Sequence, residues 1–600
     1  MDIFSISYLM RYIFLILIVS IALKLLISAI KELKWSRNHS LRPVQGYFLL
    51  NQQSDGTTSS LPLYHTTNIG RAAGNDLRIH SKEVLRNHAV IYRYDKNWYI
   101  RPQSINATIR INDAKVKEQT LLNNGDVIDF GPANFAFVDE HKIAEDRGEV
   151  YEESIYDDAA FLKAVRRNSS PLNVQWFFAN VFALIVIALI YFMMPEVKSV
   201  RQDYLIYTGA AVFIINLTAL ILPNFLRYTD KVLFLAISLL SLVGLAVQGR
   251  LFLIGNPYYQ EAVKAGVLAE IEKTASTMFS GYKVQVLALL ISLALLWFIA
   301  IIVAKTRLLE NLVYVCAALT PLFLIITLIL GRGADTHGAT LWINLGGFSL
   351  QLTEFAKITY LITLASFFKN RPPLREQIYF AGWAAVVFFL YLLLPDMGSL
   401  MILLPVTLIV FVIMTSEYFK TFLIMLSAMF ISVVAYGIFP HIRRRIEGWS
   451  TLWEEVNDAN RQVVYGLQAM ARGNFFGKGL GNGSPGGIPL AKSDMVFSIV
   501  CEEFGLIVGL AVFLLLFIVI LRGFRTNVLA RDGFTSSLAL GLGAAIFIEA
   551  FVVIGGTTGL FPLTGATIPF IAQGGSSMLA KWIMVALLIG LAARHEEGAK

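Results

Sequence analysis

Charged side chains inside long apolar runs are the residues of this sequence best placed to do chemistry. Glu354 and Lys357 lie three positions apart in the run 352–358. Side chains at this spacing share one face of a helix, so the two can form an ion pair. Ionisable residues in a membrane-spanning helix are costly and usually mark a functional site. The pair is therefore a candidate for the wall of an active cavity. The alternative is that the ion pair only holds two helices together.

Four other carboxylates lie within apolar runs or at their ends. Asp396 follows a proline at the end of one run, where a helix cap is the alternative role. Glu502 and Glu503 lie about two turns inside another run, and Glu549 lies in the middle of a third. Each is a candidate site residue for the same reason as the first pair.

Asp494 differs because it ends a long polar loop, about 439–493, at the entrance to an apolar run. The loop contains the basic triplet Arg443–Arg445 and a glycine-rich stretch, 473–483, that includes Lys478. Glycine lets backbone amides approach a phosphate closely, and the cations neutralise its charge. An acid, cations and a glycine-rich loop therefore predict polar chemistry on an anionic, lipid-linked substrate at a membrane surface.

The composition rules out a water-soluble chain. Of 600 residues, 56% are hydrophobic and 15% are charged, against about 45–50% and about 25% in ordinary globular proteins. The net charge of +8 is modest and indicates a bias in the loops rather than a nucleic-acid surface. The two cysteines, Cys316 and Cys501, lie far apart in apolar runs and imply neither a disulfide framework nor a metal cluster.

A membrane-spanning helix needs about 20 apolar residues. Thirteen runs meet or approach this length, and the first is too long for a cleaved signal peptide and lacks its small-residue cleavage site, so it is predicted to be an anchor. The runs are 4–30, 174–194, 204–226, 231–248, 284–304, 308–330, 353–368, 376–394, 398–414, 418–438, 494–521, 535–556 and 576–593.

Basic residues in the short loops predict the orientation. If the chain crosses the membrane thirteen times, nearly all of these basic residues lie on one side. They include Arg522 and Arg525, which follow the eleventh run. That side should be the cytoplasm, which places the N-terminus and Asp494 outside. Arg443–Arg445 is the main exception, because a long loop follows the rule less strictly.

Residues 44–138 alternate short β-rich stretches with turns and predict a β-sandwich. The order of their motifs resembles a forkhead-associated (FHA) domain: IGR at 69–71, ND at 75–76, RNHA at 86–89, NAT at 106–108 and GDVIDFG at 125–131. FHA domains bind phosphothreonine peptides, and the resemblance implies that Arg71 contacts the phosphate and Asn106 the peptide backbone. Guanidinium suits a phosphate dianion.

The FHA pattern is incomplete in this sequence. Leu85 stands where the family has the serine of its Ser-x-x-His motif, and Ala107 replaces a glycine. A sandwich that docks protein without phosphate is therefore the alternative, in which His88 ties loops together. Residues 139–172, acidic first and then basic, are predicted to be a solvated linker.

The membrane half resembles the SEDS family (FtsW, RodA and SpoVE) over about 231–595. Its motifs occur in the family's order: GATLWI from 338, GGFSLQLTEFAK from 346, PDMGS from 395, SDMVF and EEFG within 493–505, and GLFPLTG, PF and GGSS within 559–577. Departures include Leu352 for a proline, and Glu549 and Val553 for a glutamine and an asparagine.

Together the two resemblances imply a polytopic α-helical membrane protein with about ten core helices, about three N-terminal helices and an inserted all-β FHA sandwich. The predicted parts are an anchor at 1–30, a cytoplasmic FHA domain at 44–138, the linker at 139–172, two further spans at 173–230 and the SEDS domain at 231–595.

SEDS proteins are peptidoglycan glycosyltransferases that polymerise lipid II at the outer face of the bacterial cytoplasmic membrane, usually with a class B penicillin-binding protein. The resemblance implies that Asp494 is the catalytic residue, either as the base itself or by organising it. A divalent cation, Mg²⁺ or Mn²⁺, held between Asp494 and the diphosphate would suit the chemistry. The residues implied around the cavity are Trp342, Glu354, Lys357, Asp396, Lys478 and Arg445.

Two other functions remain open at this point. The cavity could instead move lipid II across the membrane, although a transporter needs no base at the outer face. The chain could also be a scaffold that recruits phosphorylated proteins through its FHA domain, with an inactive membrane half. The sequence does not distinguish division, elongation and sporulation.

Overall fold

The structure is a computed structural model of the chain. It describes residues 3–40, 47–52, 58–63, 66–71, 75–94, 97–104, 107–131, 133–147, 171–194, 197–226, 228–254, 268–331, 341–345, 348–369, 372–454, 456–530 and 532–594. Most of the predicted linker, and the GAT and GG of the first two SEDS motifs, lie outside these residues.

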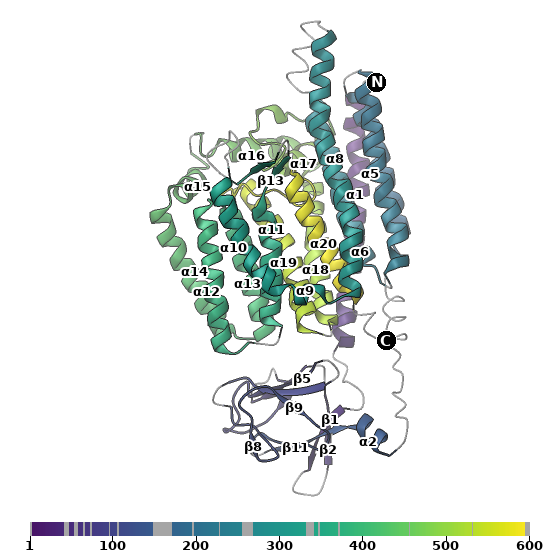
Figure 1. Cartoon of the computed structure of the whole chain (residues 1–600). Helices are drawn as coiled ribbons and strands as arrows, with labels where there is room; N and C mark the ends of the chain where they lie inside the picture. The colour runs from purple at the N-terminus through teal and green to yellow at the C-terminus, as the bar shows by residue number, and fades with distance from the viewer. Residues whose placement is uncertain are drawn as a thin grey trace. The chain divides into compact units, whose positions relative to one another are not determined.

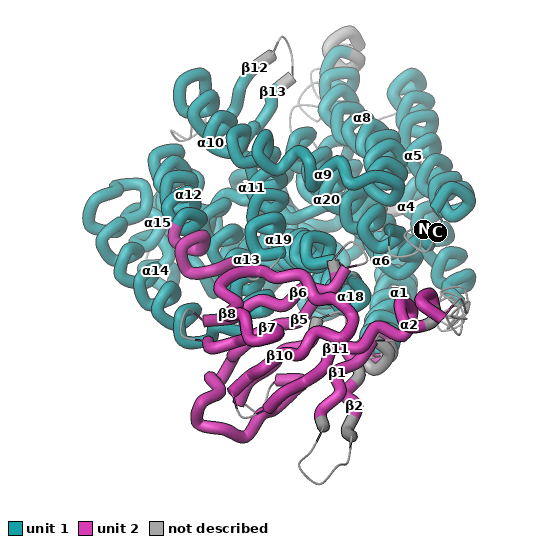
Figure 2. The backbone as a smooth tube through the Cα atoms, turned by 60° about the horizontal axis from the view of Figure 1, so that its bottom comes forward, with its two compact units in different colours: residues 1–33, 169–371, 379–600 teal, residues 34–168, 372–378 magenta. Residues whose placement is uncertain are grey.

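The chain divides into two units, which are coloured separately in Figure 2. One contains residues 1–33, 169–371 and 379–600, and is helical. The other contains residues 34–168 and 372–378, and its strands form a sandwich.

Two sheets of short strands form the sandwich. The first has the order β2-β1-β11-β10-β7-β8 and the second the order β4-β3-β5-β6-β9, with β3 and β4 as the parallel pair. Alternate strand residues such as Leu49, Ile91 and Phe137 are buried between the sheets. The strands are β1 Tyr47–Gln52, β2 Thr58–Pro62, β3 Thr66–Gly70, β4 Leu77–Arg78, β5 Ala89–Tyr94, β6 Asn97–Pro102, β7 Arg110–Ile111, β8 Ala114–Lys115, β9 Thr120–Leu122, β10 Val127–Asp129 and β11 Asn134–Asp139, followed by the helix α2 Glu140–Asp146.

His88 ties the loops at one end of this sandwich together. Its Nδ1 accepts a hydrogen bond from the backbone N–H of Leu85 at 3.1 Å, so Nε2 carries the proton and donates to the carbonyl of Thr108 at 3.0 Å. The side chain is buried. The alternative role predicted for His88, a structural tie between loops, is what the hydrogen bonds show.

The long helices of the other unit run side by side as one bundle (Figure 1). Every predicted apolar run is helical, and twelve helices within the described residues are long and apolar enough to cross a membrane. The helices are α1 Ile3–Ser40, α4 Asn173–Met193, α5 Lys198–Phe225, α6 Lys231–Leu253, α8 Leu268–Lys305, α9 Leu308–Asn311, α10 Val313–Leu330, α11 Leu352–Phe368, α12 Leu374–Leu393, α13 Met397–Thr415, α14 Tyr418–Ile438, α15 Pro440–Ser450, α16 Arg461–Gly473, α17 Val496–Phe504, α18 Leu506–Leu529, α19 Gly533–Thr557 and α20 Gly575–Arg594.

The helices differ in how much of their surface is covered. α6, α19 and α20 are buried along most of their length, whereas α14 is exposed along nearly all of it. An apolar helix that is buried on all sides lies in the bundle centre, and an exposed apolar helix can face lipid. The predicted fold class, a polytopic α-helical membrane protein with an inserted all-β sandwich, is confirmed.

Two features of the region 439–521 differ from the sequence prediction. The run 494–521 is two helices, α17 and α18, because Gly505 has a φ of +94° and a side chain there would lie 2.3 Å from the carbonyl oxygen of Phe475. The loop 439–493 also contains α15 and α16, which begin at Pro440 and Arg461. Proline at the first turn fixes φ for the helix that follows.

Arg522 and Arg525, which the sequence placed in a basic loop, are buried within α18. Arg522 pairs with Asp230 at 2.6 Å and with Glu32 of α1 at 2.8 Å. Arg525 lies 3.8 Å from Glu32 and donates to the hydroxyl of Tyr228. The prediction of a loop at this point is wrong, because α18 continues to Leu529. Burial of the two arginines is possible because the carboxylates of Glu32 and Asp230 neutralise them.

The tie made by His88 predicts that the stability of the sandwich depends on pH. Burial lowers the pKa of His88 from its ordinary value of 6.5, while its hydrogen bond with Thr108 opposes that shift. The unfolded chain therefore takes up a proton on this ring as pH falls below about 6.5, before the folded chain does. We expect the thermal midpoint of the sandwich to fall between pH 7.5 and 5.5.

His88→Gln should remove this part of the pH dependence and lower stability by about 1–3 kcal/mol, since the hydrogen bonds to two partly exposed backbone groups are lost. The exposed His80 provides a control, because His80→Gln should leave both the midpoint and its pH dependence unchanged. Equal pH dependence in wild type and His88→Gln would contradict the assignment.

Candidate active site

Asp494 lies in the turn that leads into α17 and is half-buried. Its Oδ2 would lie 3.6 Å from a side-chain carbon at Gly565, and the guanidinium of Arg445 would lie 3.5 Å from the same point. Gly565 has a φ of +72°, which favours glycine, and the absence of a side chain leaves room beside the acid. The structure therefore brings Asp494 and Arg445 together around Gly565.

Arg445 reaches this position from α15, where it is the only half-buried member of the basic triplet. Its Nη1 donates to the carbonyl of Leu563 at 2.7 Å, while Arg443 and Arg444 are exposed. The ion pairs among the described residues include neither Arg445 nor Asp494. The two charged groups are close enough to influence each other, and because no ion pair among the described residues occupies them, both can contact a substrate.

Burial is the main influence on the ionisation of both groups. It raises the pKa of Asp494 from 3.8 to about 6, while a hydrogen bond with Ser493 and the charge of Arg445 oppose the rise. Burial lowers the pKa of Arg445, while the charges of Asp396 and Asp494 oppose that change. A carboxyl group with a pKa near 6 is mostly ionised at pH 7 and still basic enough to accept a proton.

Asp396 lies near the segment 563–566, which also contains Gly565. It is the N-cap of α13: Oδ1 accepts from the backbone N–H of Ser399 at 3.0 Å and Oδ2 from its hydroxyl at 2.7 Å. A side chain at Gly398 would lie 3.6 Å from both Asp396 and Thr564. Asp396 is thus a buried cap that also acts on Arg445 through its charge.

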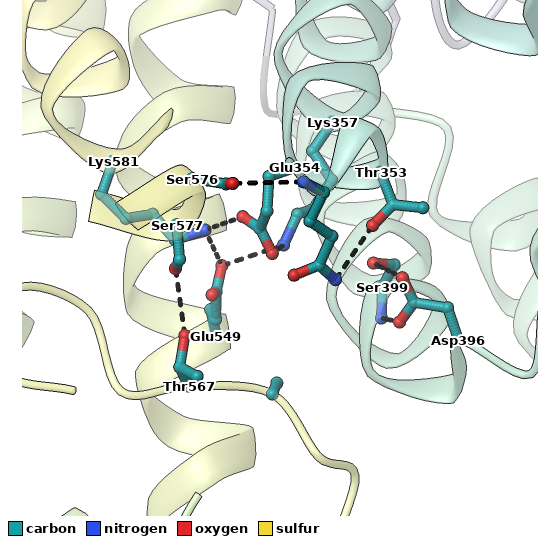
Figure 3. A network of polar contacts seen from close by, with 12 residues as sticks. Thr353, Glu354, Lys357, Asp396, Ser399, Glu549, Thr567, Ser576, Ser577 and Lys581 are labelled. Carbon is teal, nitrogen blue, oxygen red and sulfur yellow. Dashed lines mark hydrogen bonds and ion pairs between the residues drawn. The ribbon is translucent and has the colours of Figure 1, made fainter. Parts of the chain in front are cut away.

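Glu354 and Lys357 form the predicted ion pair at 2.8 Å and belong to a larger ring of four buried charges (Figure 3). Lys581 of α20 lies 2.5 Å from Glu354 and 2.8 Å from Glu549 of α19, and Lys357 lies 3.5 Å from Glu549. We name Glu354, Lys357, Glu549 and Lys581 the charge ring.

The charge ring is neutral overall, because it contains two ammonium groups and two carboxylates. Each charge has an opposite charge on two sides, which offsets the large cost of taking it out of water. Since its members come from α11, α19 and α20, the ring fixes three helices at one level of the bundle. Lys357 also acts electrostatically on Asp396, which links the ring to the Arg445 side.

Trp342 begins a short hairpin, β12 Ile343–Leu345 and β13 Phe348–Leu350, and is half-buried. The hydroxyl of Ser576, at the start of α20, donates to Ser349 at 3.2 Å and accepts from the backbone N–H of Gln351 at 3.1 Å. This holds the hairpin on the helix that carries Lys581. No hydrogen bond or ion pair among the described residues joins Trp342 to Asp494.

Lys478 lies at the opposite end of α17 from Asp494. Its backbone N–H donates to the carbonyl of Glu502 at 2.9 Å, and the ion pairs among the described residues do not include its ammonium group. The structure therefore separates Lys478 from Asp494 by the length of α17, about 13 Å.

Glu502 and Glu503 hold that end of α17 in place. Glu502 pairs with Arg472 of α16 at 2.8 Å, and Glu503 pairs with Arg250 of α6 at 2.8 Å. Glu503 also accepts from the backbone N–H of Gly481 at 3.2 Å. These carboxylates are committed to structural contacts.

The predicted divalent cation does not fit the protein groups around Asp494. No group of three His, Cys, Asp or Glu side chains suited to a metal ion occurs in the part of the chain that the structure describes. Asp494 offers one carboxylate, and the neighbouring Arg445 would repel a cation.

Arg71 is exposed at the end of β3, beside the loop held by His88, and its backbone N–H donates to Leu85 at 2.9 Å. A side chain at Gly70 would lie 2.5 Å from the carbonyl of Arg86, so the two loops touch. The predicted peptide contact Asn106 lies outside the described residues.

Sequence reasoning missed Lys581, Arg250 and Arg472. Lys581 lies within the run 576–593, so the rule that selected Glu354 and Lys357 would also have selected it. Arg250 lies at the end of an apolar helix and Arg472 within a polar loop, and neither position distinguishes a structural ion pair from an exposed cation.

The charge ring predicts a compensating pair of substitutions. Glu549→Gln leaves an unbalanced positive charge in the ring and Lys581→Met an unbalanced negative one, so each should cost about 3–5 kcal/mol. The double variant is neutral and should lose less than the two single losses combined, by about 1–3 kcal/mol. Thermal unfolding of the four proteins in detergent measures this coupling.

Lys420→Met is the matched control, since Lys420 pairs with Glu417 at a partly exposed position and should cost less than about 1 kcal/mol. Simple additivity of Glu549→Gln and Lys581→Met would show that the two residues do not act as one ring.

Comparison with known protein families agrees with the two-part architecture. The model of the FtsW/RodA/SpoVE family, described as cell cycle protein, matches residues 263–597, which is more than half of the chain. The FHA domain model matches residues 67–131.

Two curated relatives support the same grouping. RodA of Mycobacterium tuberculosis (strain ATCC 25618 / H37Rv), named a peptidoglycan glycosyltransferase, is 30% identical over 454 residues, covering 72% of this chain and 91% of the relative. Stage V sporulation protein E of Bacillus subtilis (strain 168) is 32% identical over 281 residues, covering 45% and 75%. A chain of a solved peptidoglycan synthase complex is 21% identical, with a TM-score of 0.49, covering 62% and 99%. The chain belongs to the FtsW/RodA/SpoVE family and carries an FHA domain.

Proposed function

We propose that this protein is a peptidoglycan glycosyltransferase that polymerises lipid II into glycan strands. The observation that carries the proposal is the half-buried Asp494, with its raised pKa, beside Arg445 and outside every ion pair of the described residues. The name of the mycobacterial relative supports the reaction.

In the proposed reaction Asp494 acts as the general base. It takes the proton of the acceptor's GlcNAc 4-hydroxyl as that oxygen attacks C1 of the donor MurNAc. The bond from C1 to the diphosphate breaks, and undecaprenyl diphosphate leaves with the electron pair. A carboxylate that is ionised yet basic at neutral pH suits this step.

Arg445 is proposed to stabilise the departing diphosphate. Its position is fixed by the bond to Leu563, so its charge is in place before the transition state forms. Lys357 is fully engaged by the charge ring, and we propose that it acts on the site through Asp396 rather than by contact with phosphate. Trp342 and Lys478 are proposed to line the outer surface that receives the sugars.

The sidedness follows from the same proposal. Asp494 and the loop 439–493 face the outside of the cytoplasmic membrane, and the FHA domain lies in the cytoplasm. Arg71 and Asn106 are proposed to bind phosphothreonine proteins there. Because one related chain belongs to a peptidoglycan synthase complex described as coordinating polymerization and crosslinking, we propose a cross-linking partner of the class B penicillin-binding type.

The first test of the reaction is the loss of Asp494. Purified Asp494→Asn should form no glycan strands from labelled lipid II, a loss of at least about 10³-fold, because the carboxylate beside Arg445 and Gly565 can then no longer accept a proton. The exposed Asp458 of the same loop is the control, and Asp458→Asn should retain full activity. Lipid II translocation without polymerisation by the wild type would favour a transporter instead.

The pH profile gives a second readout of the same site. Activity should rise as pH increases through about 6, as Asp494 loses its proton. Arg445→Met removes a charge that lowers the pKa of Asp494, so the rise should move to higher pH. A rise at an unchanged pH in Arg445→Met would contradict the placement of these two residues.

Binding of phosphothreonine peptides tests the FHA domain. Arg71→Ala should weaken binding by at least about tenfold, because a charge-assisted contact with the phosphate is lost. Arg93 lies at the other end of β5 and packs over the ring of Tyr47, so Arg93→Ala should bind as wild type does. Equal affinity of the wild-type protein for phosphorylated and unphosphorylated peptide would exclude a phosphate reader.

A further inference from the structure

Helix α1 precedes the region that the family model matches, yet its two ends are bonded to that region. The match begins at residue 263, and α1 covers Ile3–Ser40. The helix is packed into the bundle by buried residues such as Phe14, Ile18 and Leu25. Its polar contacts are concentrated near its ends, which apolar packing alone does not require.

The N-terminal end of α1 holds the glycine-rich loop 476–481. Ser7 donates through its hydroxyl to the carbonyl of Leu480 at 2.5 Å, and Arg11 donates through Nη1 to the carbonyl of Gly477 at 2.7 Å. A side chain at Gly479 would lie 2.8 Å from the carbonyl of Ser7, so helix and loop are in direct contact. Gly479 is therefore used for a close approach to α1.

The same loop is bonded to α17, the helix that begins directly after Asp494. The backbone N–H groups of Lys478 and Gly479 donate to the carbonyls of Glu502 and Glu503, both at 2.9 Å. Through the loop, α1 thus supports the element that positions Asp494.

The other end of α1 is bonded to α18. Glu32 pairs with Arg522 at 2.8 Å and lies 3.8 Å from Arg525. Arg11 and Glu32 are 21 positions apart, about 31 Å along the helix. Beyond Glu32 the helix continues to Ser40, and the first strand of the sandwich begins at Tyr47.

We infer that Ser7 and Arg11 are positioning residues for Asp494, and that Glu32 fixes the axial position of α1 so that these contacts are made. The helix that carries the FHA domain then also sets the loop behind the active site. The inference rests on the proposed glycosyltransferase activity for its effect on turnover, but the contacts can be tested without it.

The test compares wild type with Arg11→Ala, Arg11→Lys and Glu32→Gln, all as full-length protein. Hydrogen exchange measures the amides of residues 477–481, and lipid II polymerisation measures kcat and KM. Arg201→Ala is the control: Arg201 lies on α5, also before the matched region, and donates to Met194 rather than to the loop.

We expect Arg11→Ala to raise exchange of the loop amides by at least about tenfold with an unchanged thermal midpoint. Its kcat should fall about tenfold with KM little changed, because Asp494 is displaced rather than removed. Arg11→Lys should restore both to within about twofold. Glu32→Gln should raise exchange in the same loop although the change lies about 31 Å away, and Glu32→Asp replaces it if that protein does not fold.

The inference would be overturned if Arg11→Ala left the exchange of the loop amides unchanged. It would also be overturned if exchange rose in Arg11→Ala but not in the Glu32 variant. An equal rise in Arg201→Ala would show a general loosening and would also overturn it. If exchange behaves as expected but the wild type makes no glycan, the proposed function fails while the role of α1 stands.

Discussion

The pairing of charges inside the helical bundle is the constraint on which the rest of the structure depends. A lone charge inside a lipid-facing bundle is very costly, so each one needs a partner from another helix. The charge ring joins α11, α19 and α20, Glu503 joins α17 to α6, and Arg522 joins α18 to α1 and Asp230. These contacts fix how the apolar helices are aligned along their axes, because apolar packing alone specifies that alignment less strictly.

The candidate active site is distinguished by two charged residues that take no part in these ion pairs. Asp494 and Arg445 lie together around Gly565, yet each lacks an ion-pair partner among the described residues. A structural acid is held by its cation, as Glu354 is by Lys357 and Lys581, and has little freedom to exchange a proton. The carboxyl group of Asp494 is half-buried, and burial raises its pKa to about 6. A carboxyl group with such a pKa can both accept and release a proton near neutral pH, as acid–base chemistry requires.

The glycine-rich loop shows why the glycines of a motif need not contact a substrate. Its glycines could be expected to cradle a phosphate. Instead, Gly479 approaches α1 and Gly477 approaches Gly505. Lys478 lies with them at the far end of α17. Close backbone approach is a general use of glycine, so a glycine-rich stretch indicates a tight contact without identifying the partner.

The sequence by itself determined the two-part organisation, the apolar helical runs, the sandwich, the Glu354–Lys357 pair and the exceptional position of Asp494. These depend on local composition and on spacing along one helix or strand. Only the tertiary structure decided that Lys581 and Glu549 complete the ring, that Arg522 is buried against Glu32, and that Arg445 alone of its triplet faces Asp494. The physical reason is that these partners are far apart in the chain. Hydropathy shows that a helix is apolar, but the face it turns to each neighbour depends on how all the helices pack.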